Sequence, residues 1–282
     1  MIDDVLFRTV ELSDPLYEHE GLRFATVKSP ALGRRADVSV WVPRAEEIGT
    51  LLLLLHGVYG SHWVWSQKAG VHRIAQEMLT AGDIAPMVIA MPSDGLSRDG
   101  SGYLTWPPTQ GIVQTPIQAG AGDVERWIVE EVPAIARLAA PDLSPDAKIA
   151  IAGLSMGGYG ALRLGAKYAA RFSAISAHSS ITDICEMKNF AEEPLAEYLA
   201  CAPAAELSPF YWLETHRNIL PPIRFDCGME DDLLAGNRQL HQALKEEKIA
   251  HEYSEFPGAH DWAYWKRHIP DTLRFVSRIC AA

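Results

Sequence analysis

The sequence predicts an α/β fold, in which helices flank a mostly parallel sheet. Apolar runs alternate along the chain with stretches of helical periodicity. Several of these runs are apolar at almost every position, as expected for strands that are buried on both faces. No internal repeat, low-complexity tract or Gly/Ser linker divides the 282 residues, so we expect one domain over residues 1–282.

Four strands are expected in the first third of the chain, at residues 21–27, 37–43, 50–57 and 86–92. Pro43 ends the second strand, because proline has no N–H to donate to a ladder. A helix is expected over residues 67–82, where Gly82 supplies the C-terminal stop.

The rest of the chain continues the alternation. Strands are expected at residues 148–153, 172–178, 223–228 and 251–258. Helices are expected at residues 122–140, 156–170, 233–248 and 261–278. Two long segments interrupt the pattern: residues 93–120 are rich in Gly, Ser, Pro and Thr, and residues 183–222 read as irregular and contain five prolines. Long excursions from a compact domain are often functional loops, so we expect both to form the rim of a pocket.

Charge and hydropathy exclude several classes of partner. The chain has 25 basic and 36 acidic residues and no run of Lys or Arg, which argues against nucleic acid or an anionic membrane. Its longest aliphatic run, Leu51 to Leu55, is too short to span a bilayer. The acidic N-terminus lacks the features of a signal peptide, so a cytoplasmic location is expected, although a secreted chain without its leader would look similar. The oligomeric state cannot be read from the sequence.

Neither a disulfide framework nor a metal site is expected. Four cysteines occur without any C-x-x-C pair and are interpreted as buried free thiols: Cys185, Cys201, Cys227 and Cys280. His56, His62 and His72 do not have the spacing of zinc ligands on one helix.

A serine between glycines marks the first candidate for chemistry. Gly153-Leu154-Ser155-Met156-Gly157 fits G-x-S-x-G and lies where an expected strand gives way to an expected helix. A serine at the tip of such a turn adopts strained backbone angles, and side chains two residues before and after it would collide. The N-terminus of the following helix favours negative charge that develops nearby. Ser155 is therefore the predicted nucleophile.

Such a serine needs a base and an orienting carboxylate, which follow it in the order Ser, Asp/Glu, His in this architecture. The stretch "FDCGMEDDLL" places Glu230, Asp231 and Asp232 just past an expected strand. The stretch "FPGAHDWAYW" places His260 just past the next one. Catalytic groups collect at the carboxyl ends of parallel strands, so these side chains are expected to meet Ser155.

Four motifs in fixed order carry a family resemblance, and they are His56 to Ser61, Gly153 to Ala161, Gly228 to Leu234 and Gly258 to Trp262. With them the chain resembles the esterase D-like family of α/β-hydrolases over nearly its whole length. That family includes S-formylglutathione hydrolases, feruloyl and acetyl esterases, and mycolyltransferases. The resemblance implies an α/β-hydrolase fold, a small-molecule ester as substrate, and no cofactor.

The resemblance also implies roles for individual residues. Ser155 is the expected nucleophile and His260 the base, and the spacing G-x-x-D from Gly228 selects Asp231 as the acid. The backbone N–H groups of Val58 and Met156 are the expected oxyanion donors. His56 is expected to brace the loop that contains Val58.

Substrate contacts are expected from five residues, which are Tyr59, Tyr103, Trp106, His178 and Trp262. Phe210, Tyr211 and Trp212 in the second excursion are expected to complete an aromatic rim. For the tryptophans, packing in the core is an equally good interpretation, and for His178 a structural place at the surface or in the core is equally good.

The sequence thus predicts a serine carboxylesterase that acts on short-chain or aryl esters through a covalent acyl-enzyme. An acyltransferase, or a thioesterase such as an S-formylglutathione hydrolase, would use the same triad. S-formylglutathione hydrolases typically carry a cysteine-containing stretch where this chain has "VYGSHWVW", which argues against that specificity. A binding module without turnover is the remaining alternative, and an intact triad argues against it.

Overall fold

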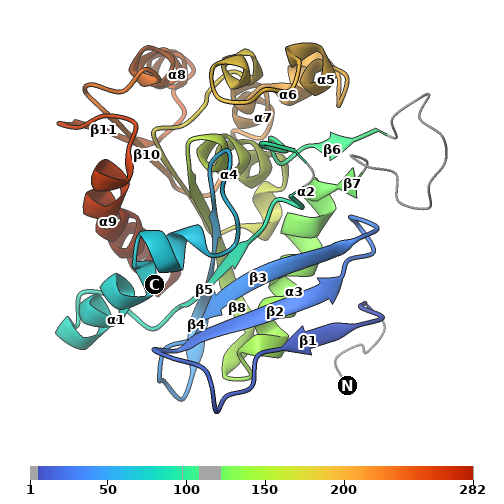
Figure 1. The fold of residues 1–282 in the computed structure, drawn as a ribbon. Helices are drawn as coiled ribbons and strands as arrows, with labels where there is room; N and C mark the ends of the chain where they lie inside the picture. Colours follow the sequence, from blue (N-terminus) through green and yellow to red (C-terminus); the bar gives the residue numbers. More distant parts are fainter. Residues whose placement is uncertain (1–5, 97, 108–121, 282) are drawn as a thin grey trace, which may run out of the picture.

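The computed structural model describes residues 6–96, 98–107 and 122–281. Over these residues one sheet has nine strands in the order β1-β2-β3-β5-β4-β8-β9-β10-β11 (Figure 1). These strands are β1 (Val10–Leu12), β2 (Leu22–Lys28), β3 (Arg35–Trp41), β4 (Ile48–Leu55), β5 (Val88–Pro92), β8 (Leu143–Leu154), β9 (Ala174–His178), β10 (Ile223–Gly228) and β11 (Glu252–Phe256). From β5 across to β11 all neighbours pair in parallel, and β1, β2 and β3 add an antiparallel edge. The mostly parallel sheet expected from the sequence is confirmed.

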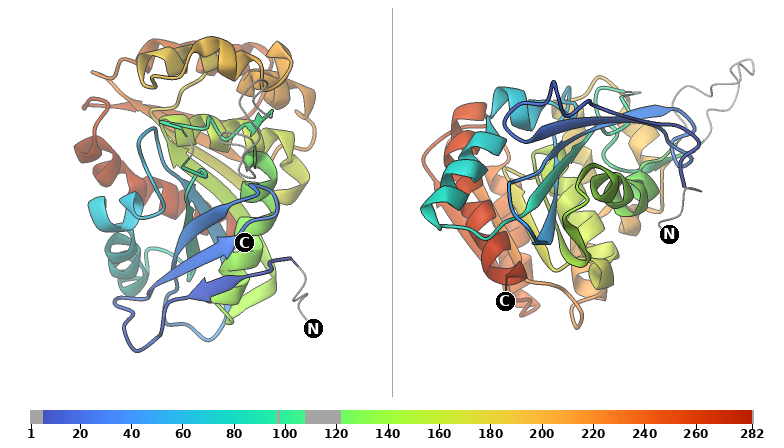
Figure 2. Two further views of the ribbon diagram at one scale, coloured as in Figure 1. Left: turned by 45° about the vertical axis from the view of Figure 1, so that its right-hand side comes forward. Right: turned by 90° about the horizontal axis from the view of Figure 1, so that it is seen from below.

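The leucine run in β4 shows why the sheet is covered on both faces. Leu51, Leu53 and Leu55 join one apolar cluster, and Leu52 and Leu54 join the other. Side chains alternate along a strand, so a strand that is apolar at every position needs packing partners on both sides. Helices α3 (Val132–Ala139), α4 (Met156–Lys167) and α8 (Leu234–Glu246) contribute to the first cluster, and α1 (Val71–Ala81) and α9 (Trp262–Cys280) to the second (Figures 1 and 2).

One expected helix is divided at a glycine, and another runs on through a π-helical turn. The helix expected over 67–82 is divided at Gly70, which has a φ of +72° between the π-helical turn η1 (Val64–Lys68) and α1. The helix expected over 122–140 becomes α2 (Val124–Arg126), a π-helical turn η2 (Trp127–Glu131) and α3. Pro133, which has no N–H to donate, lies just after this π-helical turn.

The second excursion is more regular than its sequence indicates. It contains η4 (Ile184–Asn189), α5 (Leu195–Leu199), α6 (Ala204–Leu207) and α7 (Pro209–Thr215). Three of its prolines, Pro194, Pro203 and Pro209, stand at the first residue of a helix or just before it. Proline suits that position because its fixed φ is already helical, so these prolines begin helices here rather than prevent them.

Only part of the first excursion is described. The described part includes the short strand β6 (Thr105–Trp106), which pairs with β7 (Gly122–Asp123) just past the excursion. Residue 97 and residues 108–120 of the expected rim lie outside the described residues.

In the described part of the chain, no helix has both the length and the apolar character needed to cross a membrane. All four cysteines are free, but only Cys227 and Cys280 are buried, and Cys185 is exposed.

Candidate active site

Ser155 lies on the tight turn that joins β8 to α4. Its φ of +53° falls in the left-handed region, which is unusual for a residue with a side chain and marks a strained turn. A Cβ atom at Gly153 would collide with the carbonyl group of Gly157, and one at Gly157 would lie 2.5 Å from the carbonyl oxygen of Leu55. Both positions therefore need glycine, as the sequence indicated. The residue is 2% exposed.

Three side chains, each just past the carboxyl end of a parallel strand, form one hydrogen-bonded chain. The Oγ of Ser155, which follows β8, lies 3.0 Å from Nε2 of His260, which follows β11. The Nδ1 of His260 lies 2.9 Å and 3.1 Å from the two carboxylate oxygens of Asp231, which follows β10. The structure thus brings together the three residues that the sequence singled out.

The structure also separates Asp231 from its acidic neighbours. The Asp231 carboxylate is buried and accepts the N–H of Leu233 at 2.8 Å. Burial alone would raise its pKa, but the hydrogen bonds from His260 and Leu233 outweigh burial and hold the pKa below its usual value. Asp232 is exposed, and the carboxylate of Glu230 accepts the N–H of Gly258. Of the three acids, Asp231 is the one bonded to His260.

The loop after β4 lies against the serine turn. A Cβ atom at Gly57 would lie 3.3 Å from Cβ of Ser155. The peptide bond between Gly57 and Val58 therefore lies close to the serine. Met156 is the first residue of α4, and its N–H has no carbonyl partner one turn earlier. Both expected oxyanion donors therefore lie beside Ser155.

Buried hydrogen bonds hold this loop in place. The Nδ1 of His56 lies 2.7 Å from the carbonyl oxygen of Gly57, and its Nε2 accepts the N–H of Asp94 at 3.2 Å. The hydroxyl of Tyr103 donates to the carbonyl oxygen of His56 at 3.0 Å. His56 therefore braces the loop, as expected from the sequence.

Asp99 joins the two excursions above the loop. Its carbonyl oxygen accepts the N–H of Tyr59 at 2.7 Å, and its own N–H donates to the carboxylate of Glu193 at 2.9 Å. A Cβ atom at the next residue, Gly100, would lie 2.5 Å from Sδ of Met156. Tyr59 is 65% exposed here, and its hydroxyl donates to the carboxylate of Asp99 at 3.2 Å.

Three of the expected substrate contacts are wrong. Tyr103 and His178 are completely buried, and Trp106 is nearly so. Their polar atoms already have partners in the protein, as buried polar groups normally do. Tyr103 bonds to the loop before Val58, Trp106 donates to the carbonyl oxygen of Ser101, and His178 bonds to Asp226 and Thr272. The hydroxyl of Tyr103 and the main chain of His178 hydrogen-bond to segments next to Ser155.

The aromatic rings that lie against His260 are not the expected ones. Trp212 packs over Lys167, at the far end of α4, and Tyr211 packs on Trp212. Twelve residues of helix separate Lys167 from Ser155, which is about 18 Å at the usual rise, so Tyr211 and Trp212 lie away from Ser155. Phe210 packs against the apolar cluster that includes α4. Instead the rings of Phe190 and Trp265 lie 5.2 Å and 5.0 Å from the imidazole of His260, measured between centroids. Trp262 packs on Trp265 and remains half-buried.

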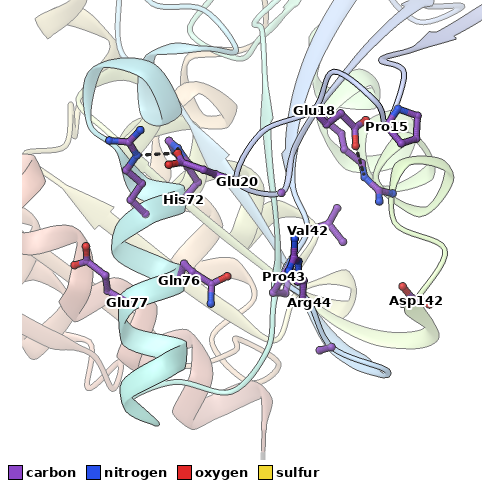
Figure 3. Close-up of a pocket in the computed structure, with 14 residues that line it drawn as sticks. Pro15, Glu18, Glu20, Val42, Pro43, Arg44, His72, Gln76, Glu77 and Asp142 are labelled. Carbon is purple, nitrogen blue, oxygen red and sulfur yellow. Dashed lines mark hydrogen bonds and ion pairs between the residues drawn. The ribbon is translucent and has the colours of Figure 1, made fainter.

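Figure 3 shows the residues that line a cavity of about 870 Å³. It is lined by Val42 and Pro43 after β3, by Gln76 on α1 and by Asp142 just before β8. Asp142 lies at the opposite end of β8 from Ser155, which follows that strand, so the cavity is on the other side of the sheet's strand ends from the serine turn. No expected site residue lines this cavity. Within the described residues, no group of three or more His, Cys, Asp and Glu side chains is placed to hold a metal ion.

Comparison with solved structures defines the class of fold. A ferulic acid esterase superposes with a TM-score of 0.71 over 97% of this chain and 99% of its own, at 24% identity. An S-formylglutathione hydrolase from Staphylococcus aureus superposes with a TM-score of 0.71 over 95% of this chain and 99% of its own, at 18% identity. The fold is that of the α/β-hydrolases.

The particular family follows from the sequence comparison. The family model described as "Putative esterase" matches residues 29–276, and the chain belongs to that esterase family. An acetyl esterase from Caldicellulosiruptor saccharolyticus is 31% identical over 147 residues, which cover 47% of this chain. The match spans only 55% of that relative's own length.

Proposed function

We propose that the protein is a serine carboxylesterase that works through a covalent acyl-enzyme. The observation that carries the proposal is the hydrogen-bonded chain from Ser155 through His260 to Asp231, placed on a strained strand-to-helix turn in a chain of the esterase family. This arrangement supplies a nucleophile, a base and an orienting carboxylate.

In the proposed first step, Ser155 Oγ attacks the ester carbonyl carbon while His260 Nε2 takes the hydroxyl proton. The ionised Asp231 fixes the imidazole tautomer and stabilises the imidazolium that forms. The N–H groups of Val58 and Met156 stabilise the oxyanion, and being fixed beforehand they need no reorganisation. His260 then returns its proton to the leaving alcohol. Water, activated by His260, attacks the acyl-enzyme, releases the acid and regenerates Ser155.

We further propose short-chain or aryl esters as substrates. Phe190 and Trp265 flank the imidazole, and Asp99 ties the two excursions together above the oxyanion loop. Such a rim suits a compact acyl or aryl group better than a long chain. Each methylene contact is worth only about 1–3 kcal/mol, so selectivity should be graded.

The proposal is tested with a panel of p-nitrophenyl, naphthyl, feruloyl and glutathione esters and the purified protein. We expect measurable kcat/KM on short acyl or aryl esters that disappears in the Ser155→Ala variant. Turnover confined to glutathione thioesters would favour a thioesterase instead.

We propose the cytoplasm as the place of action, because four free cysteines suit a reducing compartment. Fractionation of cells with an antibody against the protein tests this location. Recovery mainly outside the cytoplasm would contradict it.

A further inference from the structure

A second buried carboxylate–histidine pair lies near the serine turn. His178 is on β9, the strand next to β8, and Asp226 is on β10, one strand further. Leu154, His178 and Asp226 are register partners on the adjacent parallel strands β8, β9 and β10. The Nδ1 of His178 lies 2.9 Å from one carboxylate oxygen of Asp226 and 3.1 Å from the other. Both side chains are completely buried, and the proposed reaction uses neither.

This pair contacts the backbone that carries Ser155. The N–H of Ser155 donates to the carbonyl oxygen of His178 at 2.9 Å. On the other side of its ring, Nε2 of His178 lies 2.8 Å from Oγ1 of Thr272 in α9. The imidazole is thus held at both nitrogens, and its main chain holds the serine turn.

Asp226 also contacts the turn that carries His260. The hydroxyl of Tyr264, in the first turn of α9, donates to Asp226 at 2.7 Å. The N–H of Tyr264 donates to the carboxylate of Asp261. The ring of Tyr264 packs closely on Gly258, where an added Cβ atom would lie 2.7 Å from the ring. His260 lies between these two contacts in the chain.

The charge of Asp226 strengthens these hydrogen bonds. Burial alone would raise its pKa, but His178, Arg224 and Tyr264 outweigh burial and lower the pKa to about 2. Arg224 Nη1 lies 2.6 Å from the carboxylate. The group is therefore ionised at neutral pH, and an ionised acceptor makes the stronger kind of hydrogen bond.

We propose that Asp226 is a positioning residue, which holds the turns of Ser155 and His260 at the separation that the reaction needs. The inference rests on the proposed function. Asp226 acts through His178 on one turn and through Tyr264 on the other, and it touches no reacting atom. Displacement of a reacting group by about 1 Å can cost about 100-fold in rate, so a rigid link between the two turns has a direct use.

The chain offers a matched control with the same chemistry at another place. Glu125 is a buried carboxylate that pairs with the buried Arg163. It accepts the hydroxyl of Tyr168 at 3.0 Å. Tyr168 follows the C-terminal end of α4, whereas Ser155 precedes the N-terminal end. Tyr168→Phe therefore removes the same kind of bond as Tyr264→Phe, far from the reacting groups.

The experiment compares these two variants with the wild-type protein. The measurements are kcat and KM on a short p-nitrophenyl ester, the rate of Ser155 labelling by an organophosphonate, and unfolding in urea. We expect both variants to lose similar stability. Only Tyr264→Phe should lower kcat and the labelling rate, by about tenfold, with KM changed less than about twofold. Equal kcat in Tyr264→Phe and wild type, or equal losses in both variants, would overturn the proposal.

Substitutions at Asp226 give a second, independent measurement. Asp226→Asn keeps one oxygen that can accept the hydroxyl of Tyr264, so it should retain more kcat than Asp226→Ala at matched folded fraction. Equal kcat in the two folded variants would contradict the positioning role. Full activity in Ser155→Ala contradicts the proposed function, and the inference falls with it. Activity that depends on Ser155 but not on Tyr264 contradicts the inference alone.

Discussion

His260 Nδ1 lies 2.9 Å from a carboxylate oxygen of Asp231, while the next residue, Asp232, is exposed to solvent. Two adjacent aspartates thus have different environments, and only one of them can fix the imidazole tautomer. This difference gives a comparison within one loop.

Asp231→Asn should lower kcat by about 10³- to 10⁴-fold, because the amide favours the wrong tautomer of His260. Asp232→Asn should change kcat by less than about twofold, since an exposed side chain away from the site has little effect. Steady-state kinetics on one short ester measures both. Loss of activity in Asp232→Asn, together with full activity in Asp231→Asn, would show that Asp232 and not Asp231 is the acid.

The serine turn itself can be tested through stability. Gly157→Ala places a Cβ atom 2.5 Å from a backbone oxygen, so overpacking should cost about 1–3 kcal/mol of unfolding free energy. Gly49→Ala is the control, because a Cβ atom there meets nothing within 4 Å. Urea unfolding followed by tryptophan fluorescence measures both. Equal stability of the two variants would show that the turn has more room than its geometry indicates.

The proposed acyl pocket is tested at Phe190, whose ring lies against that of His260. The wild-type enzyme should be active on esters from acetyl to hexanoyl, and its activity should fall steeply beyond about C8. Phe190→Ala should raise the octanoyl-to-acetyl ratio of kcat/KM by about tenfold, since removing the ring opens the rim. Trp212→Ala, on α7 beside Lys167 at the far end of α4, should leave the ratio unchanged. A wild-type preference for palmitoyl over butyryl esters refutes this pocket and leaves the triad untouched.

Stability in acid should depend on Asp226. Its pKa is about 2 in the folded protein, against an ordinary value of 3.8, so the native state binds fewer protons than the unfolded state in this range. Its stabilising contribution is complete above the ordinary pKa and is lost as the pH falls toward 2. Between about pH 5 and pH 2 the wild type should lose about 2 kcal/mol more unfolding free energy than Asp226→Asn. Parallel pH profiles of the two proteins in urea titrations would contradict this.

The central strands and the triad were accessible from sequence because each depends on local constraints. The leucines of β4 need cover on two faces, and Gly153 and Gly157 are needed by a turn that only a few residues define. The acid required one more step, since Glu230 and Asp232 also follow β10 and only the family spacing separated them from Asp231.

The aromatic neighbours of His260 were harder to predict from the sequence, because they depend on contacts between distant segments. Phe190 reaches His260 across 70 positions of chain, and no local pattern marks it. Trp265 could have been suspected from the sequence, since it lies only five residues after His260. Tyr103 and His178 are polar enough to resemble site residues, yet tertiary packing gave their polar atoms partners inside the protein.

The most direct test of the account is to locate the covalent adduct of an organophosphonate. Intact-mass measurement should show one equivalent bound with loss of activity, and peptide mapping by mass spectrometry should place it on Ser155. The Ser155→Ala variant should remain unlabelled and lose turnover by about 10³-fold or more. An adduct mainly on another residue, or an active Ser155→Ala variant, would contradict the assignment of Ser155 as the nucleophile.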